Sequence, residues 1–354
     1  MAEAEQFHIE LTKNSSLAST DFDNLTFGSV FSDHMIEIDY IDGEWQTPKV
    51  RPYQNLSFAP SMVALHYGQT IFEGLKAYKD KTGNILTFRP EEHARRINES
   101  SGRLCMPQLP EGIFLGSLKK LLEIDKDWVP DGKGKSLYIR PIMFATDEAL
   151  GVVPSQKYKF LIFTSPVAQY YAGDVKVMVE ENYVRAAEGG TGYIKMGGNY
   201  SASLLPAKRA LENGYQQILW TDSREHKYVE EIGTMNVMFQ IGDTIVTPRL
   251  TTSILSGITR KSVIELAKKW GYKIEERRIS VEEIIDAHKK GLLLDAFGTG
   301  TAATITHISM IGYKGKDYII PEDSPREFST KAQEYLVDLK TGEADDFMHW
   351  MTKI

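Results

Sequence analysis

The hydrophobic positions of the chain follow two different periods. Short apolar runs rich in β-branched and aromatic residues predict strands, which lie at 35–40, 86–88, 137–140, 158–163 and 175–179. Two stretches between these runs show helical spacing instead. The first begins at Pro90, and the second carries Ile113, Leu118, Leu121 and Leu122 on one face. The pattern therefore predicts an α/β protein in which strands and helices alternate.

The later part of the chain repeats this alternation. A helix is predicted from a cap at Asn199 to just before Gly214, and it is followed by strand-like runs at 218–221 and 228–239. Apolar residues at helical spacing then predict a helix at 258–270, which ends before Gly271. A further helix, opened by Ser324-Pro325 and closed by Gly342, is interpreted as ordinary packing.

A boundary between two domains is predicted near the middle of the chain. Residues 169–174 have the composition of a linker, and strand-like sequence resumes at 175. We therefore expect a small N-terminal α/β domain at 1–165, an interdomain loop at 166–180 and a larger C-terminal domain at 181–354. A chain of 354 residues has enough material for both.

Composition and charge restrict the class of protein. With 42% hydrophobic and 25% charged residues, the chain is typical of a soluble globular protein. A formal charge of −7 with mixed signs argues against a nucleic-acid surface, and no run approaches the ~18 apolar residues of a membrane span. Cys105 is the only cysteine, which excludes internal disulfides and suits a reducing compartment. The first residues resemble neither a secretory signal nor a transit peptide, so we expect a cytoplasmic protein.

One lysine stands in an otherwise uncharged stretch between glycines. Lys195 lies within residues 192–200, GYIKMGGNY. An amine withdrawn from water loses part of its preference for the charged form, and the neutral amine is the nucleophile that forms a Schiff base with an aldehyde. From this segment alone, a solvent-exposed lysine on a glycine-rich loop is an equally good interpretation.

Two segments together resemble a known family. The segment 195–200, KMGGNY, followed by 231–236, EIGTMN, resembles the branched-chain amino-acid aminotransferases, which are fold-type IV pyridoxal 5′-phosphate (PLP) enzymes. The resemblance runs from about Phe27 to about Trp350. It implies a D-amino-acid aminotransferase-like fold of two α/β domains (α+β in overall character), with the cofactor in the interdomain cleft and held mainly by the C-terminal domain.

The resemblance also implies which residues hold the cofactor. Lys195 would form the Schiff base and carry the proton, Glu231 would face the pyridine nitrogen, and Tyr200 would donate to the ring oxygen. Taken singly, Glu231 is better interpreted as a solvated strand charge and Tyr200 as a packed aromatic. The phosphate would be bound by the start of the helix at 258 and by side chains elsewhere, that is, by Arg96, Gly257, Ile258, Thr259 and Thr301. Only the family register selects Arg96 over its neighbour Arg95.

The substrate pocket is assigned in the same way. Backbone N–H groups of Thr301 and Ala302 would bind the substrate carboxylate. The side-chain walls implied by the family pattern are Phe27, Tyr67, Phe72, Tyr138, Tyr170 and Thr234. Without the resemblance, most of these would be interpreted as core residues. Arg140 would bind the distal carboxylate of 2-oxoglutarate, and the alternative is a structural ion pair.

The implied activity is transamination of L-leucine, L-isoleucine and L-valine with 2-oxoglutarate, by a homodimer. The alternative is a related enzyme of the same fold, a D-amino-acid aminotransferase or an aminodeoxychorismate lyase. Residues 298–303 also fit a GxGxxA dinucleotide pattern, which we discount because no acidic residue follows in a βαβ unit. The eight histidines show no metal-ligand spacing, so no metal is expected. Residues 303–306 lack the CxxC pair of some eukaryotic members, which favours a bacterial enzyme.

Overall fold

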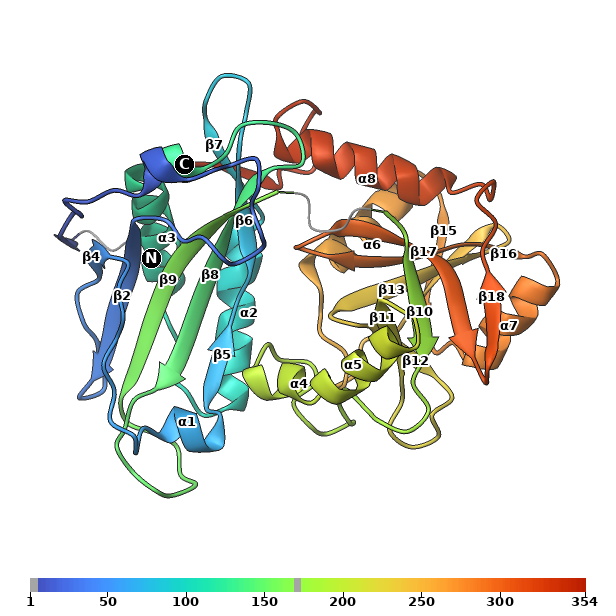
Figure 1. Ribbon diagram of the computed structural model, residues 1–354, viewed down its shortest axis with the longest axis horizontal. Helices are drawn as coiled ribbons and strands as arrows, with labels where there is room; N and C mark the ends of the chain where they lie inside the picture. The colour runs from blue at the N-terminus through green and yellow to red at the C-terminus, as the bar shows by residue number, and fades with distance from the viewer. Residues whose placement is uncertain (1–5, 169–172) are drawn as a thin grey trace. The chain divides into compact units, whose positions relative to one another are not determined.

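A computed structural model of the chain describes residues 6–168 and 173–354 (Figure 1). The chain divides into two compact units. Unit 1 contains the described residues up to 168 together with 194–197 and 337–354, and unit 2 contains 173–193 and 198–336. The structural fold class is α/β, as predicted.

Unit 1 is built on a sheet of mostly antiparallel strands. Its strands are β1 (His8–Ile9), β2 (His34–Ile41), β3 (Glu44–Trp45), β4 (Lys49–Pro52), β5 (Thr70–Phe72), β6 (Leu75–Lys79), β7 (Ile85–Phe88), β8 (Ser136–Ala145), β9 (Tyr158–Val167) and β19 (Met351–Lys353). Within the described residues they form one ten-stranded sheet in the order β1-β4-β2-β9-β8-β6-β7-β19, with β3 beside β2 and β5 beside β8. The helices are α1 (Val63–Tyr67), α2 (Pro90–Arg103) and α3 (Glu111–Ile124), and short 3-10 turns occupy Leu17–Ser19 and Lys126–Trp128.

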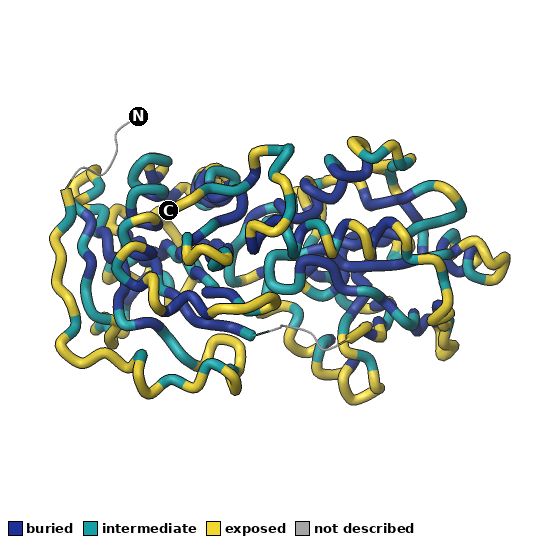
Figure 2. The backbone as a smooth tube through the Cα atoms, turned by 90° about the horizontal axis from the view of Figure 1, so that it is seen from above, coloured by how far each residue is buried: buried dark blue, intermediate teal, exposed yellow. Residues whose placement is uncertain are grey.

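The predicted apolar face of α3 covers this sheet. Leu118, Leu121 and Leu122 lie in one buried cluster with Ile36 of β2 and Phe160 of β9. The backbone positions of this cluster are among the buried segments coloured dark blue in Figure 2. Removing such side chains from water contributes about 1.5–3 kcal/mol each, which is what holds the helix on the sheet.

Unit 2 contains a sheet that closes on itself. Its strands are β10 (Val175–Val179), β11 (Gln217–Thr221), β12 (Val229–Ile232), β13 (Met235–Ile241), β14 (Thr244–Pro248), β15 (Lys273–Arg277), β16 (Leu293–Gly300), β17 (Thr304–Tyr313) and β18 (Lys316–Ile319). Among the described residues the order is β12-β11-β10-β17-β16-β13-β14-β15, and β12 also pairs with β13. This extra pairing closes six strands into a ring, so that none of the six is an open edge.

The helices of unit 2 follow the predicted pattern with one correction. They are α5 (Leu204–Glu212), α6 (Ile258–Lys269) and α7 (Val281–Lys289), while α4 (Gly197–Ser201) and α8 (Glu327–Lys340) each contain a boundary between the units. The single helix predicted from Asn199 is in fact two helices. Asn199 is not a cap: its amide lies inside α4, where it donates to the carbonyl of Thr191 at 2.7 Å and accepts from the Thr191 hydroxyl.

The strand-like run at 228–239 is a hairpin. Gly233, with φ of +52°, turns the chain between β12 and β13, and a Cβ there would lie 1.9 Å from Gln217 Oε1. Residues 298–303 belong to a second hairpin, β16–β17, whose strands are antiparallel. This is not the strand-to-helix turn of a dinucleotide fold, which agrees with discounting that pattern.

The two units do not follow the chain in strict succession. The predicted domain at 181–354 includes residues 194–197 and 337–354, but the structure groups both segments with unit 1. The physical reason at the C-terminal end is strand pairing, because β19 lies antiparallel to β7 with Met351 opposite Phe88. In the part of the chain that is described, no helix is long and apolar enough to cross a membrane.

Candidate functional site

The lysine singled out in the sequence is held in place by its backbone. In unit 1, the N–H of Lys195 donates to Ser100 Oγ at 3.1 Å, and its carbonyl accepts from the N–H of Phe72 at 2.9 Å. The side chain is half-buried, and Nζ lies 5.0 Å from the centre of the Phe72 ring. This environment is not that of a solvent-exposed lysine on a loop.

Arg96 and Arg95 have different environments. Arg95 is exposed and pairs with Glu92 at 3.2 Å, whereas the side chain of Arg96 is only 8% exposed. Arg96 makes a two-pronged pair with Glu73, from Nε to Oε1 at 2.7 Å and from Nη2 to Oε2 at 2.9 Å. The structure therefore places Arg96, and not Arg95, among the buried residues of unit 1.

The partner of Arg96 is a fully buried carboxylate. Glu73 also accepts from Nδ1 of His93 at 2.7 Å. Burial by itself raises the pKa of this carboxyl, but the charge of Arg96 and the hydrogen bonds from Arg96 and His93 outweigh burial and hold the pKa of Glu73 well below its usual range. Burial lowers the pKa of His93, and Glu73 offsets this only in part, so the imidazole is neutral at neutral pH and donates through Nδ1.

Four of the predicted pocket residues form one cluster in unit 1. Tyr138 and Arg140 alternate with Ile139 on β8 and so point to the same side of the strand. Arg140 Nη2 donates to the hydroxyl of Tyr138 at 3.0 Å, and its guanidinium carbon lies 4.7 Å from the ring centre of Phe72. Phe27 packs edge-on against Tyr138, with ring centres 5.0 Å apart.

The same cluster answers the question left open about Arg140. Among the described residues Arg140 makes no ion pair, and its buried Nε has no hydrogen-bond partner. A structural ion pair is therefore not what the described structure provides. Tyr67 stands apart from the cluster: it ends α1, is 44% exposed, and its ring contacts His66. Tyr170 lies outside the described residues.

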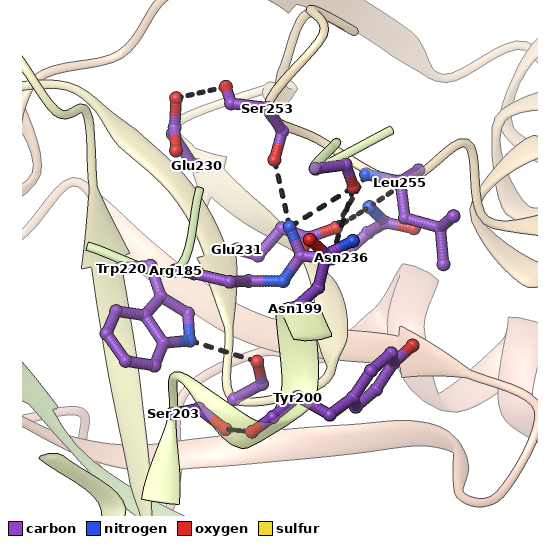
Figure 3. A network of polar contacts seen from close by, with 12 residues as sticks. Arg185, Asn199, Tyr200, Ser203, Trp220, Glu230, Glu231, Asn236, Ser253 and Leu255 are labelled. Carbon is purple, nitrogen blue, oxygen red and sulfur yellow. Dashed lines mark hydrogen bonds and ion pairs between the residues drawn. The ribbon is translucent and has the colours of Figure 1, made fainter. Parts of the chain in front are cut away.

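In unit 2 the predicted ring-nitrogen partner is a buried carboxylate with an ion pair and hydrogen bonds (Figure 3). Glu231 Oε2 pairs with Nε of Arg185 at 2.7 Å, and Oε1 accepts from the Asn236 side chain at 3.1 Å and from the N–H of Leu255 at 3.0 Å. Glu231 is 3% exposed, so it is not a solvated strand charge.

The start of α6 is joined to this carboxylate. Gly257 is the N-cap and offers no side-chain cap, and a Cβ at this position would lie 2.0 Å from Asn236 Oδ1. Only glycine fits such a close approach. Ile258 and Thr259 follow as buried first-turn residues, whose N–H groups have no acceptor within the helix. These N–H groups and the helix dipole suit an anion.

The hairpin turn at 301–303 lies beside the same strands. Glu231 is paired with Asn236 across β12 and β13, and Asn236 is paired with Thr299 across β13 and β16. Thr299 Oγ1 is buried and has no hydrogen-bond partner among the described residues. Half-buried Thr301 and Ala302 follow directly, while Thr234 is exposed at the tip of the β12–β13 hairpin. Tyr200, in α4, is half-buried next to Asn199 (Figure 3).

Sequence reasoning missed three residues of these clusters: Glu73, His93 and Arg185. Glu73 directly follows Phe72, which the family pattern selects as a pocket wall, but Glu73 itself was not selected. A charged residue that directly follows the apolar Ile71 and Phe72 of a strand was the available signal. For Arg185 and His93 no spacing rule applies, because their partners are distant in the sequence.

The carboxylate next to Glu231 has a different character. Glu230 is buried and accepts a hydrogen bond from the hydroxyl of Ser253. Burial raises the pKa of Glu230 to about 7; the hydrogen bond from Ser253 opposes this shift, and the negative charges of Glu231 and Asp222 add to it. At neutral pH this carboxyl therefore holds its proton part of the time.

We expect Glu230→Gln to change how stability depends on pH. The folded-state pKa of Glu230 lies above the ordinary 4.5, so the unfolding free energy that it contributes is lost as pH rises from about 4.5 to about 7. At about 1.4 kcal/mol per pKa unit, the variant should be more stable than the parent by up to about 3 kcal/mol at pH 8 and equal to it at pH 4.5. Denaturant unfolding at several pH values measures this. Glu225→Gln, at an exposed position, is the control, and a pH-independent difference for Glu230→Gln would contradict the prediction.

The chain is similar to known proteins in its family pattern, its sequence and its fold. Residues 70–311 match the family described as Amino-transferase class IV. The chain is 46% identical over 350 residues to branched-chain-amino-acid aminotransferase 2 of Bacillus subtilis (strain 168), which covers 98% of this chain and 96% of that protein. Its fold is similar to the crystal structure of Escherichia coli branched-chain amino acid aminotransferase, with a TM-score of 0.72 and 26% identity over 89% of this chain and 98% of that chain.

A third relative was solved with a ligand. The branched-chain amino acid aminotransferase of T.th., in complex with N-(5′-phosphopyridoxyl)-L-glutamate, has a TM-score of 0.71 and 26% identity over 89% of this chain and 97% of that chain. That ligand joins the phosphopyridoxyl group to glutamate. That relative therefore binds a single ligand in which both groups are joined.

Proposed function

The chain belongs to the class IV aminotransferase family, and from this premise we propose that it exchanges the amino group between L-leucine, L-isoleucine or L-valine and 2-oxoglutarate. The observation that carries the proposal is the 46% identity to a branched-chain enzyme along 98% of the chain. The segments of Lys195 and Glu231 both lie inside the matched family region, 70–311.

The enzyme uses PLP, the cofactor of this family. When bound, PLP supplies an aldehyde that reacts with amines and a ring that withdraws electrons from the substrate carbon. The residues present fit this group: a half-buried lysine, a buried carboxylate with a charged partner, and a helix start capped by glycine. Thr299 Oγ1, buried and without a partner among the described residues, adds a polar atom beside the strands of that carboxylate.

The roles proposed for the residues are those that the family resemblance implies, and the chemistry of each side chain suits its role. Lys195 Nζ would hold the cofactor and would move the proton of the substrate Cα. Glu231 would accept a charge-assisted hydrogen bond from the ring nitrogen and so favour its protonated form, and Tyr200 would donate to the ring oxygen. The phosphate is bound by Arg96, Thr301 and the first N–H groups of α6, namely those of Gly257, Ile258 and Thr259.

The substrate is bound at both ends. By the family pattern, the N–H groups of Thr301 and Ala302 would bind its α-carboxylate. The walls proposed for its side chain are Phe27, Tyr67, Phe72, Tyr138, Thr234 and Tyr170, the last of which lies outside the described residues. One pocket must accept both an isobutyl group and a carboxylate. Arg140 supports this dual use, because its guanidinium lies on aromatic rings and makes no ion pair among the described residues.

Arg140→Met should separate the two substrate classes. A hydrogen bond to a charged group contributes about 1.5–3 kcal/mol, so we expect kcat/KM for glutamate to fall by roughly 10- to 150-fold. The value for leucine should change only a few-fold, since leucine brings no distal carboxylate. Steady-state kinetics with both amino acids measure this. Equal losses for the two substrates, or a lower melting temperature with unchanged selectivity, would indicate a structural role instead.

Coupled assays test the function itself. The purified protein is assayed with leucine, isoleucine, valine and D-alanine as amino donors and 2-oxoglutarate as acceptor. Activity with the three branched L-amino acids and none with D-alanine is expected. Turnover of D-alanine alone, or release of a lyase product from aminodeoxychorismate, would assign the chain to the related enzymes of the same fold.

We also place the enzyme in the cytoplasm as a homodimer. A single cysteine suits a reducing compartment. Leu150, Val152 and Val153 are neighbours in the chain and are 65–83% exposed, which is the kind of apolar stretch that a second copy covers. Light scattering coupled to size exclusion measures the mass in solution, and a monomeric mass would exclude the dimer.

A further inference from the structure

Arg185 makes more polar contacts than a simple ion-pair partner needs. Its side chain is 6% exposed, and Nε pairs with Glu231 Oε2 at 2.7 Å. Nη1 donates to the carbonyl of Ser253 at 2.9 Å, and Nη1 and Nη2 both lie 3.3 Å from the carbonyl of Gly192. Figure 3 shows the guanidinium between Glu231 and Ser253.

The two carbonyl contacts tie down the segments that lead to other site residues. Gly192 is followed closely by Lys195, and a Cβ on Gly192 would lie 2.4 Å from the Ser253 carbonyl oxygen. Ser253 is followed by Leu255, whose N–H binds Glu231 Oε1, and then by the N-cap Gly257. One guanidinium therefore joins three segments of unit 2, each of which carries or precedes a residue assigned to the cofactor.

We propose that Arg185 is a positioning residue of the cofactor site: it keeps Glu231 ionised and aligned and, through the Gly192 and Ser253 carbonyls, fixes the segments that precede Lys195 and α6. The inference rests on the proposed function. Arg185 itself is assigned no contact with substrate or cofactor.

The charge balance around Glu231 requires such a cation. A buried carboxylate without a partner takes up a proton, because burial disfavours the charged form. Glu230, its neighbour in the chain, is a second buried carboxyl, and the repulsion between the two pushes in the same direction. Arg185 is the cation in direct contact with Glu231. Its planar fork also serves three acceptors at once, which a lysine ammonium on a flexible stem does not do in the same geometry.

The first experiment uses the holoenzyme and asks whether Arg185 acts through Glu231. Arg185→Gln should raise the dissociation constant of PLP by about tenfold or more, since it removes a hydrogen-bonded charge beside Glu231. It should also move the pH midpoint of the absorbance of bound PLP. Arg185→Lys keeps the positive charge, so its absorbance midpoint should lie close to that of the parent. In a Glu231→Gln background, adding Arg185→Gln should change the dissociation constant of PLP by no more than about twofold and should leave the pH midpoint of the absorbance nearly where it was.

The second experiment uses the cofactor-free protein. Hydrogen exchange of the peptide containing 253–257 should be faster in Arg185→Gln, because the Ser253 carbonyl and the Leu255 N–H lose their fixed partners. Arg326→Gln is the matched control: Arg326 is a largely buried arginine of unit 2 paired with Asp174, remote in role from Glu231. It should leave exchange at 253–257 and the absorbance midpoint unchanged.

The outcomes separate this inference from the proposed function. If the parent protein transaminates leucine but Arg185→Gln keeps its PLP affinity, absorbance midpoint and exchange rates, the positioning role is overturned. Independent shifts that add in the double variant would overturn it too, since Arg185 would then act without Glu231. If the parent binds PLP and Arg185→Gln behaves as expected while leucine is not a substrate, the positioning role holds and the substrate proposal fails.

Discussion

Replacing Lys195 with alanine should abolish transamination while the protein stays folded. The substitution removes the amine that binds the cofactor and the group that moves the substrate proton, and the loss of proton transfer alone slows a reaction by about 10²–10⁴-fold. The backbone contacts of Lys195 with Ser100 and Phe72 do not depend on the side chain, so the fold of unit 1 should be retained. Coupled assays with leucine, together with a melting curve, measure both halves of the prediction.

The control for this variant is Lys208→Ala, an exposed lysine on α5. It should keep full activity. Borohydride treatment of the parent in the presence of PLP should label the peptide that contains Lys195, as detected by mass spectrometry. A substantial remaining activity in Lys195→Ala, or labelling at another lysine, would refute the assignment.

The second large effect is expected at Glu73 and concerns stability. Glu73→Gln leaves the buried Arg96 without its carboxylate, and removing one partner of a buried pair typically costs about 3–5 kcal/mol. Because the folded-state pKa of Glu73 is lowered, its stabilising contribution is present above the ordinary 4.5 and is lost as pH falls below it. The variant should therefore be least stable relative to the parent at neutral pH, and the gap should narrow in acid.

Thermal unfolding of the cofactor-free protein measures this change. The control is Glu123→Gln, which breaks an exposed pair with Lys120 on α3 and should shift stability by less than about 1 kcal/mol. If Glu73→Gln lowers stability no more than Glu123→Gln does, Arg96 finds another partner in the variant. PLP affinity should also fall in Glu73→Gln, because Arg96 loses its fixed orientation.

Most of the secondary structure could be predicted from local patterns, because the strands and helices themselves have local causes in the sequence. The strand-rich runs and the apolar face of α3 follow from side-chain periodicity, and both are confirmed. The break between α4 and α5 was missed because Asn199 is a good cap by type, whereas its amide serves Thr191. The return of β19 to β7 was missed because strand pairing over such a separation leaves no signal in a short window.

In the candidate site, too, some residues could be predicted from local sequence and others could not. Lysine and glutamate segments could be selected because their neighbours form compact motifs, and periodicity explains why adjacent Glu230 and Glu231 have different environments on one strand. The groups that hold the site residues are different. Glu73, His93 and Arg185 act through tertiary contacts that bring distant segments together, and buried charges of this kind resemble ordinary surface charges in a sequence.

The closed ring of six strands has a consequence for the order in which the protein can be made. β10 pairs in parallel with β17, which is synthesised more than a hundred residues later. β10 therefore cannot form this pairing when it is made. Until Thr304–Tyr313 has left the ribosome, β10 exposes an unpaired edge, and apolar edges of this kind attract other chains. The sheet of unit 1 is completed even later, since β7 pairs with β19 at residues 351–353. Because non-local pairing is slow, we expect closure of the two sheets, rather than helix formation, to set the pace of folding.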